Sequence, residues 1–95
     1  MRGDYKTTGG KLVSVNFDVE AGHLRNVQVS GDFFLYPEEA LGDIRAALEG
    51  LPEATGQVEI VDKIRGALAP DVSMVGFSPE AVAIAVERGL GRDHQ

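Results

Sequence analysis

The stretch LVSVNFDVEAGHLRNVQVSG, residues 12 to 31, contains two alternating segments separated by a turn. Every odd position from 13 to 19 is apolar, and every even position from 14 to 20 is polar. Such alternation predicts a half-buried β-strand, because successive side chains of a strand point to opposite faces. Val27 and Val29 resume the alternation, so the stretch predicts a β-hairpin.

The predicted hairpin turn is Glu20-Ala21-Gly22-His23, in which Gly22 suits a positive φ. Leu24 has the opposite parity from the valines that follow it. Two arrangements bring these side chains to one face: a bulge near Arg25-Asn26, or a three-residue loop. The sequence leaves both open.

Three helices are predicted after the hairpin. They run from Pro37 to Gly50, from a cap at Thr55 to Ala69, and from a cap at Ser78 to Gly89. Apolar residues three and four apart predict the buried faces of the first two helices. These residues are Leu41, Ile44, Ala47 and Leu48 in the first helix and Val58, Val61, Ile64 and Leu68 in the second.

The last predicted helix is apolar almost all the way round, from residue 81 to residue 86. Such a helix is either deeply buried or in contact with a partner. Phe77, directly before the Ser78 cap, is expected to staple against Val82.

A hairpin followed by three helices is typical of an α+β domain, with the helices on one face of a small antiparallel sheet. A two-stranded sheet is marginal by itself, so we expect a third strand. Either Asp4 to Thr8 or Val72 to Val75 is expected to supply it. The predicted organisation is an extended N-terminal arm at 1–10, a single domain at 11–91 and a frayed tail at 92–95.

Composition excludes several classes of function. Fifteen acidic and nine basic residues give a net charge of −6, which offers no footprint for nucleic acid. The chain has no cysteine, which excludes disulfides, thiolate nucleophiles and cysteine-bound metals. The longest apolar run is too short to span a bilayer, and the first ten residues lack the apolar segment of a secretory signal. We therefore expect a cytoplasmic protein that makes no membrane contact.

The chain offers no obvious catalytic residue. Its two histidines, His23 and His94, fall in the predicted turn and in the tail, where neither is held rigidly. The carboxylates are spread along helix faces and do not have the spacing of metal ligands. We expect neither a catalytic nor a metal site, and the chain is not expected to be catalytic alone.

Residues 31 to 36 read GDFFLY and place three aromatic side chains at a strand-to-helix corner. Neighbouring side chains in an extended segment point opposite ways, so two adjacent phenylalanines cannot both enter one core easily. Exposed aromatic surface is typical of a protein interface, whereas a well-packed corner is the alternative. The candidate interface residues are Gly31, Asp32, Phe33, Phe34 and Tyr36.

A second candidate is the basic, glycine-rich segment that contains Lys6 and Gly9-Gly10-Lys11. Consecutive glycine amides beside a lysine can bind an anion. The spacing of a nucleotide-binding P-loop is absent, and a plain flexible entry into the strand is the alternative.

Residues 9 to 50, GGKLVSVNFDVEAGHLRNVQVSGDFFLYPEEALGDIRAALEG, resemble the C-terminal accessory domain of lipoate-protein ligases. The likeness lies in the strand, the turn glycine, the strand ending in Gly-Asp-Phe-Phe and the acid-led helix. Residues 57 to 90 agree more loosely, through a second helix and the segment VGFSPE at 75–80. The fold is also similar to scaffold proteins of iron–sulfur assembly and sulfur transfer. Those proteins work through cysteine, which this chain lacks.

The chain contains only the small part of such a ligase, so it resembles the small subunit of a bipartite lipoate-protein ligase. The resemblance implies a heterodimer whose large catalytic subunit binds ATP, Mg and lipoate and forms lipoyl-adenylate. That subunit would then transfer the lipoyl group to a lysine of a lipoyl acceptor domain, an indirect partner of this chain.

The small chain would bind no cofactor alone and would support the adenylation step by docking on its partner. Its segment with Lys6, Gly9, Gly10 and Lys11 is expected to approach the partner's nucleotide site. The alternative is a self-associating interaction or structural domain without a role in cofactor ligation.

Overall fold

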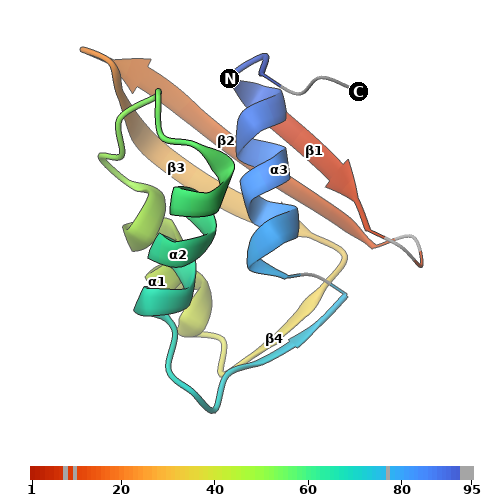
Figure 1. Ribbon diagram of the computed structural model, residues 1–95. Coiled ribbons are helices and arrows are strands. Elements are labelled where there is room, and N and C mark those ends of the chain that lie inside the picture. The colour runs from red at the N-terminus through yellow and green to blue at the C-terminus, as the bar shows by residue number, and fades with distance from the viewer. Residues whose placement is uncertain (8, 10, 77, 93–95) are drawn as a thin grey trace.

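The computed structural model describes residues 1–7, 9, 11–76 and 78–92 (Figure 1). The elements in chain order are β1 (Arg2–Lys6), β2 (Leu12–Glu20), β3 (His23–Gly31), β4 (Phe34–Tyr36), α1 (Ala40–Leu48), α2 (Gln57–Ala67), β5 (Ser73–Val75) and α3 (Pro79–Gly89). Strands β1, β2 and β3 form one antiparallel sheet in that order, and β4 pairs with β5 in a separate antiparallel ribbon. None of the helices in the described part of the chain has the length and apolar character needed to cross a membrane.

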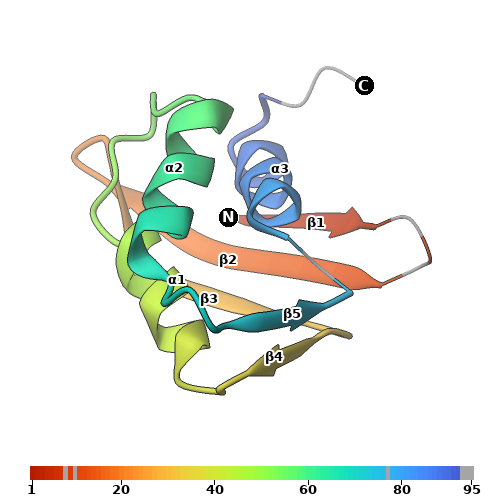
Figure 2. The ribbon, with the colours of Figure 1, turned by 60° about the horizontal axis from the view of Figure 1, so that its bottom comes forward.

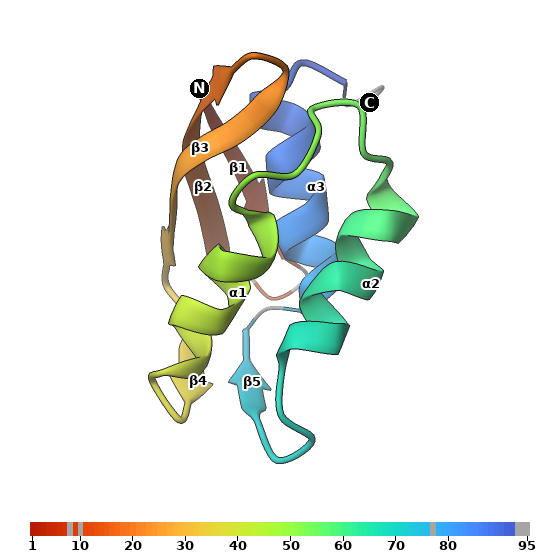
Figure 3. The same cartoon turned by 90° about the vertical axis from the view of Figure 1, so that its left-hand side faces the viewer.

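The three helices lie on one side of the three-stranded sheet, as Figure 3 shows in side view. Helix α3 packs across β1 and β2, α1 packs on β3, and α2 packs against α1 and α3. The buried core fills the space between the layers and includes Val13, Val15, Phe17, Ile44 and Ile64. The predicted α+β architecture is confirmed.

Strand β1 supplies the third strand of the main sheet, pairing with β2 so that Tyr5 lies opposite Val13. Of the two candidate segments, the N-terminal one therefore joins this sheet, while 73–75 pairs with β4 instead. Residues 2–6 of the expected arm are thus part of the folded domain, because Gly3 and Tyr5 face the core. Thr8 and Gly10 lie outside the described residues.

The hairpin turns through Ala21 and Gly22, whose φ angles are +53° and +79°. Glu20 and His23 form the pair that closes it, so the loop has two residues. Two successive positive φ values match the twist of the flanking strands. The predicted turn is confirmed.

A β-bulge interrupts the hairpin and corrects the parity of β3. The strand register shifts at Phe17, which lies opposite both Asn26 and Val27. Asn26 has a φ of +56°, the left-handed conformation that a short polar residue tolerates. The bulge is thus the arrangement that the structure adopts, and Leu24 and Val27 are both buried.

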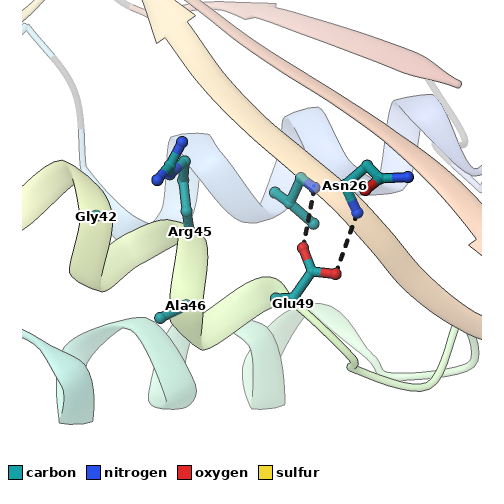
Figure 4. Close-up of a pocket in the computed structure, with 6 residues that line it drawn as sticks. Asn26, Gly42, Arg45, Ala46 and Glu49 are labelled. Carbon is teal, nitrogen blue, oxygen red and sulfur yellow. Dashed lines mark hydrogen bonds between the residues drawn. The ribbon is translucent and has the colours of Figure 1, made fainter.

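Glu49, directly after α1, holds this bulge. Its two carboxylate oxygens accept hydrogen bonds from the backbone N–H of Asn26 (3.1 Å) and of Val27 (3.0 Å), as Figure 4 shows. The backbone N–H of Gly50 donates to the Leu24 carbonyl oxygen at 2.7 Å. The end of α1 is therefore fixed to the irregular part of β3.

Two glycines allow α3 to approach the sheet closely. A Cβ on Gly3 would lie 1.7 Å from the carbonyl oxygen of Ala85 and 2.4 Å from the N of Gly89. A Cβ on Gly89 would lie 2.7 Å from a ring carbon of Phe17. Contacts of this kind leave no room for a side chain, so the β1–α3 packing depends on both glycines.

Helix α1 begins at Ala40 rather than at Pro37. The amides of Ala40 and Leu41 bond to the carbonyls three residues earlier, which makes 37–39 a turn that leads into the helix. The predicted buried residues Ile44 and Leu48 are confirmed.

Helix α2 begins after Gly56, and the predicted Thr55 cap is wrong, since the Thr55 hydroxyl donates to the Pro52 carbonyl oxygen. Val58 is 75% exposed, whereas Ile60 is 1% exposed. Ile60 and Ile64 lie one turn apart and set the buried face, and Val58 falls outside it.

Helix α3 begins as predicted, because the Ser78 hydroxyl accepts a hydrogen bond from the N–H of Ala81. Its buried residues are Pro79, Ala81, Val82, Ala83, Ala85 and Val86. The nearly continuous apolar surface is thus covered by β1, β2 and α2. The predicted staple by Phe77 lies outside the described residues.

Arg92, expected in the frayed tail, is held in place. Its guanidinium donates to the carbonyl oxygens of Glu53 and Thr55 and lies 3.5 Å from the Glu87 carboxylate. This contact fixes the loop before α2 to the end of α3. Residues 93–95 lie outside the described residues.

Replacing Gly3 with alanine is expected to destabilise the fold by about 1–3 kcal/mol or more, because the new methyl group must displace backbone atoms. Urea unfolding of both proteins measures the loss. The control is Gly66→Ala in α2, where the added methyl group meets no atom within 4 Å. The control should gain up to about 1 kcal/mol from helix propensity. Equal stability of Gly3→Ala and the original protein would contradict the close β1–α3 packing.

Replacing Glu49 with alanine should cost about 1–3 kcal/mol, because two backbone N–H groups of the bulge lose their acceptor. Thermal unfolding measures this loss, with Glu53→Ala in the next loop as the matched loss of one carboxylate. A change no larger than that of the control would show that the bulge does not need Glu49.

Candidate functional site

The corner after β3 is shaped by Gly31. Its φ is +152°, and a Cβ there would lie 2.0 Å from the carbonyl oxygen of Leu12. The backbone N–H of Asp32 donates to the same carbonyl at 3.0 Å, and the Asp32 side chain is exposed. Only glycine fits this position, and it allows the chain to leave the sheet and enter β4.

The two adjacent phenylalanines point in different directions, as the sequence predicted. Phe33 is partly buried against the core, whereas Phe34 is 73% exposed. Tyr36, two residues further along β4, is 74% exposed. Leu35, which lies between Phe34 and Tyr36, packs on the core.

Strand β5 completes the surface that β4 begins. Phe34 lies opposite Val75, Leu35 opposite Met74 and Tyr36 opposite Ser73. The inner residues Leu35 and Met74 pack on the core. The other side of the ribbon exposes Phe34, Tyr36 and Val75, and we call these three residues the outer ribbon face. Figure 2 shows β4 and β5 side by side at the edge of the molecule.

Val75 is the member of this face that the sequence did not assign to a site. The sequence places it only in a candidate third strand and in the segment VGFSPE. The alternation of Val75 and Met74 was a usable signal, because strand neighbours face opposite sides. What the sequence lacked was the pairing of this short segment with β4.

A hollow of about 420 Å³ lies beside β4 and is lined by Phe33, Phe34, Leu35, Glu38 and Leu41. Its walls are mostly apolar, with the exposed Glu38 as the one charged residue. The hollow can take an apolar side chain from another molecule.

Lys11 lies close to the end of the ribbon. Gly76, which follows β5, has a φ of +88°, and a Cβ there would lie 2.6 Å from the Cγ of Lys11. The Thr7 hydroxyl donates a shared hydrogen bond to the carbonyl oxygens of Lys11 and Gly76, each 3.2 Å away. The loop between β1 and β2 is therefore tied to the end of β5.

Lys6 lies on the other side of the sheet. Tyr5 packs on the core, so Lys6, the next residue of the strand, points away from the helices. The backbones of the two lysines are close, because Lys6 pairs with Leu12, but the Lys11 side chain lies over Gly76 and the Lys6 side chain does not share its direction. Gly9 has a φ of +96° with open space around it, and Gly10 lies outside the described residues.

Two carboxyl groups have shifted pKa values. A hydrogen bond from Ser14, followed by one from Arg2, lowers the pKa of Asp4. A hydrogen bond from Arg65 lowers the pKa of Glu80. Both groups are paired on the surface, so these shifts reflect structural contacts.

A second hollow, of about 270 Å³, is lined by Asn26, Val27, Gly42, Arg45, Ala46 and Glu49 (Figure 4). The Glu49 carboxylate already accepts hydrogen bonds from the two backbone N–H groups of the bulge. The hollow is therefore part of the α1–β3 contact, and its acid is not available as a catalytic base.

The described residues contain no cluster of three histidine or acidic side chains that could hold a metal ion. In the same part of the chain, every buried side-chain N or O atom has a hydrogen-bond partner. His23 stands in the hairpin turn, with its Nδ1 2.9 Å from the Ala21 carbonyl oxygen. His94 lies outside the described residues.

Comparison with known proteins found no matching family model. The chain is 29% identical over 69 residues to "Lipoate-protein ligase A subunit 2" from Thermoplasma acidophilum. This match covers 73% of the chain and 69% of the relative.

The fold matches a chain in the solved structure of an archaeal lipoylation system, a bipartite lipoate protein ligase and its E2 lipoyl domain from Thermoplasma acidophilum. The TM-score is 0.73 at 26% identity, over 90% of this chain and 92% of that one. The two matches agree with the resemblance carried by residues 9 to 50. In sequence and in fold, the chain is therefore similar to a subunit of a bipartite lipoate-protein ligase.

Proposed function

We propose that this chain docks on a catalytic subunit and supports the ATP-dependent activation of lipoate to lipoyl-adenylate. The observation that carries the proposal is the structural match to the bipartite ligase, which spans nearly all of both chains. The sequence match to subunit 2 of a lipoate-protein ligase supports the same assignment.

In this proposal ATP, Mg²⁺ and lipoate bind on the catalytic subunit. The small subunit supplies no reacting group and instead orders the partner's residues around the reacting groups. Such preorganisation accelerates a reaction because the groups that stabilise the developing charge need not be arranged at the moment of reaction. Lipoyl acceptor domains then meet the catalytic subunit, and this chain acts on them indirectly. We place the complex in the cytoplasm, consistent with a chain that has no cysteine.

The proposed docking segment is Gly31 to Tyr36. Gly31 and Asp32 form the corner, Phe33 anchors it on the core, and Phe34 and Tyr36 present aromatic surface. Aromatic side chains that are exposed in the free protein are well suited to fill pockets in a partner. The segment with Lys6, Gly9, Gly10 and Lys11 is proposed to approach the partner's nucleotide site.

Purified catalytic subunit should form lipoyl-adenylate from ATP and lipoate much faster when this chain is added, and this chain alone should form none. Pyrophosphate release measures the rate, and gel filtration of the mixture measures the complex. Turnover by this chain alone, or an equal rate without it, would contradict the proposal. If the chain formed a stable homodimer that did not bind the catalytic subunit, the result would favour the alternative of a self-associating domain.

Replacing Phe34 or Tyr36 with alanine should weaken binding to the catalytic subunit by about tenfold or more, as expected for aromatic anchor residues. Thermal stability should change little, because both side chains are mostly exposed. The control is Phe33→Ala, which removes core contacts and should lower stability by about 1–3 kcal/mol. Calorimetric titration and thermal unfolding of the same samples separate the two effects. Parallel losses of stability and binding at position 34 would count against a docking role.

A further inference from the structure

We infer that the outer ribbon face and Lys11 form one continuous docking surface, and that Lys11 meets phosphate oxygens of the nucleotide bound to the catalytic subunit. The inference rests on the proposed function and refines it in two ways. It adds Val75 to the interface, and it selects Lys11 over Lys6 as the cation that approaches the nucleotide.

The outer ribbon face is a preformed apolar surface. Phe34, Tyr36 and Val75 are 73%, 74% and 57% exposed, and the β4–β5 pairing places them together. The ribbon is held from behind by Leu35 and Met74, which pack on the core. A partner therefore meets a surface whose backbone is already ordered, which lowers the entropic cost of binding.

Lys11 lies beside the end of the ribbon at which Phe34 is opposite Val75. Its aliphatic stem lies over Gly76, the residue directly after Val75. Because Gly76 has no side chain, the stem can lie flat there, and the Thr7 hydroxyl fixes both backbones. Only the terminal part of the lysine remains free to reach outward.

The ammonium group of Lys11 has no ion-pair or hydrogen-bond partner in the described part of the chain. Asp32 is also exposed at this corner, but no ion pair joins it to Lys11. The chain as a whole carries a net charge of −6, which would repel a polyphosphate. A cation beside the outer ribbon face lowers that repulsion locally, which makes this end of the surface the most favourable one for a phosphate.

Lys6 does not share this position. It projects from the face of the sheet opposite to the helices, on the same face as the Arg2–Asp4 ion pair. A partner that covers the outer ribbon face is contacted by Lys11 and leaves Lys6 in solvent. The two lysines are therefore a matched pair for a test.

The apolar part is tested with Val75→Ser against Val58→Ser, since Val58 is equally apolar and 75% exposed but lies on α2. Titration calorimetry with the catalytic subunit, without ATP, should show about tenfold weaker binding for Val75→Ser and little change for Val58→Ser. Thermal unfolding confirms that both variants are folded. Equal effects, or a larger effect of Val58→Ser, would overturn the docking surface.

The charged part is tested with Lys11→Met against Lys6→Met in the reconstituted complex. Lys11→Met should raise the KM for ATP in lipoyl-adenylate formation by about tenfold, the loss of one charge-assisted contact, while Lys6→Met should not. Subunit affinity without ATP should be nearly the same for both variants.

Three other outcomes would each contradict a different part of the account. If Lys11→Met weakens subunit binding equally with and without ATP, the lysine meets a carboxylate of the partner, and the phosphate assignment is wrong. If both lysine variants behave like the original protein, Lys11 has no such role. If the original chain itself forms no complex with the catalytic subunit, the proposed function has failed, whereas normal complex formation with unaffected variants overturns only this inference.

Discussion

The pairing of β4 with β5 is the constraint on which the candidate site depends. It joins a segment that follows the hairpin to one that precedes the last helix, and each strand has only three residues. Inward-facing Leu35 and Met74 anchor the ribbon, so the alternation of the strands turns Phe34, Tyr36 and Val75 outward. Without this pairing the exposed aromatics would lie on a free loop.

Glycines allow close packing at three junctions between the sheet, the ribbon and the last helix. Gly31 lets the chain pass the Leu12 carbonyl, Gly76 accepts the stem of Lys11, and Gly3 meets the backbone of α3. In each case a Cβ would lie closer than 3.0 Å to another atom. Close packing at these three glycines therefore helps to set the relative position of sheet, ribbon and last helix, with the aliphatic core filling the remaining space.

The hairpin, the three helices and the Ser78 cap could be predicted because local periodicity and turn chemistry determine them. The opposite orientations of Phe33 and Phe34 could also be predicted, since alternation is a local property. The face of α2 was predicted partly wrongly, with Val58 in place of Ile60, because two apolar stripes compete on that helix. Only packing against α1 and α3 decides between them.

The parts that could not be predicted depend on contacts between distant segments. The sequence offers no local signal that Ser73–Val75 pairs with Phe34–Tyr36, or that Glu49 caps a bulge in β3. The different directions of the Lys6 and Lys11 side chains follow from the pairing of β1 with β2 and from the contact of Lys11 with Gly76, which the sequence left open. The resemblance to lipoate-protein ligases, in contrast, could be recognised in residues 9 to 50, and both matches agree with it.

Hydrogen exchange of this chain, alone and in complex with the catalytic subunit, tests the central claim most directly. The account predicts that binding slows exchange in residues 32–36 and 73–76 and in the segment around Lys11, while the exposed face of α2 exchanges as before. Protection concentrated on α2, or on the polar outer face of the three-stranded sheet, would contradict the account.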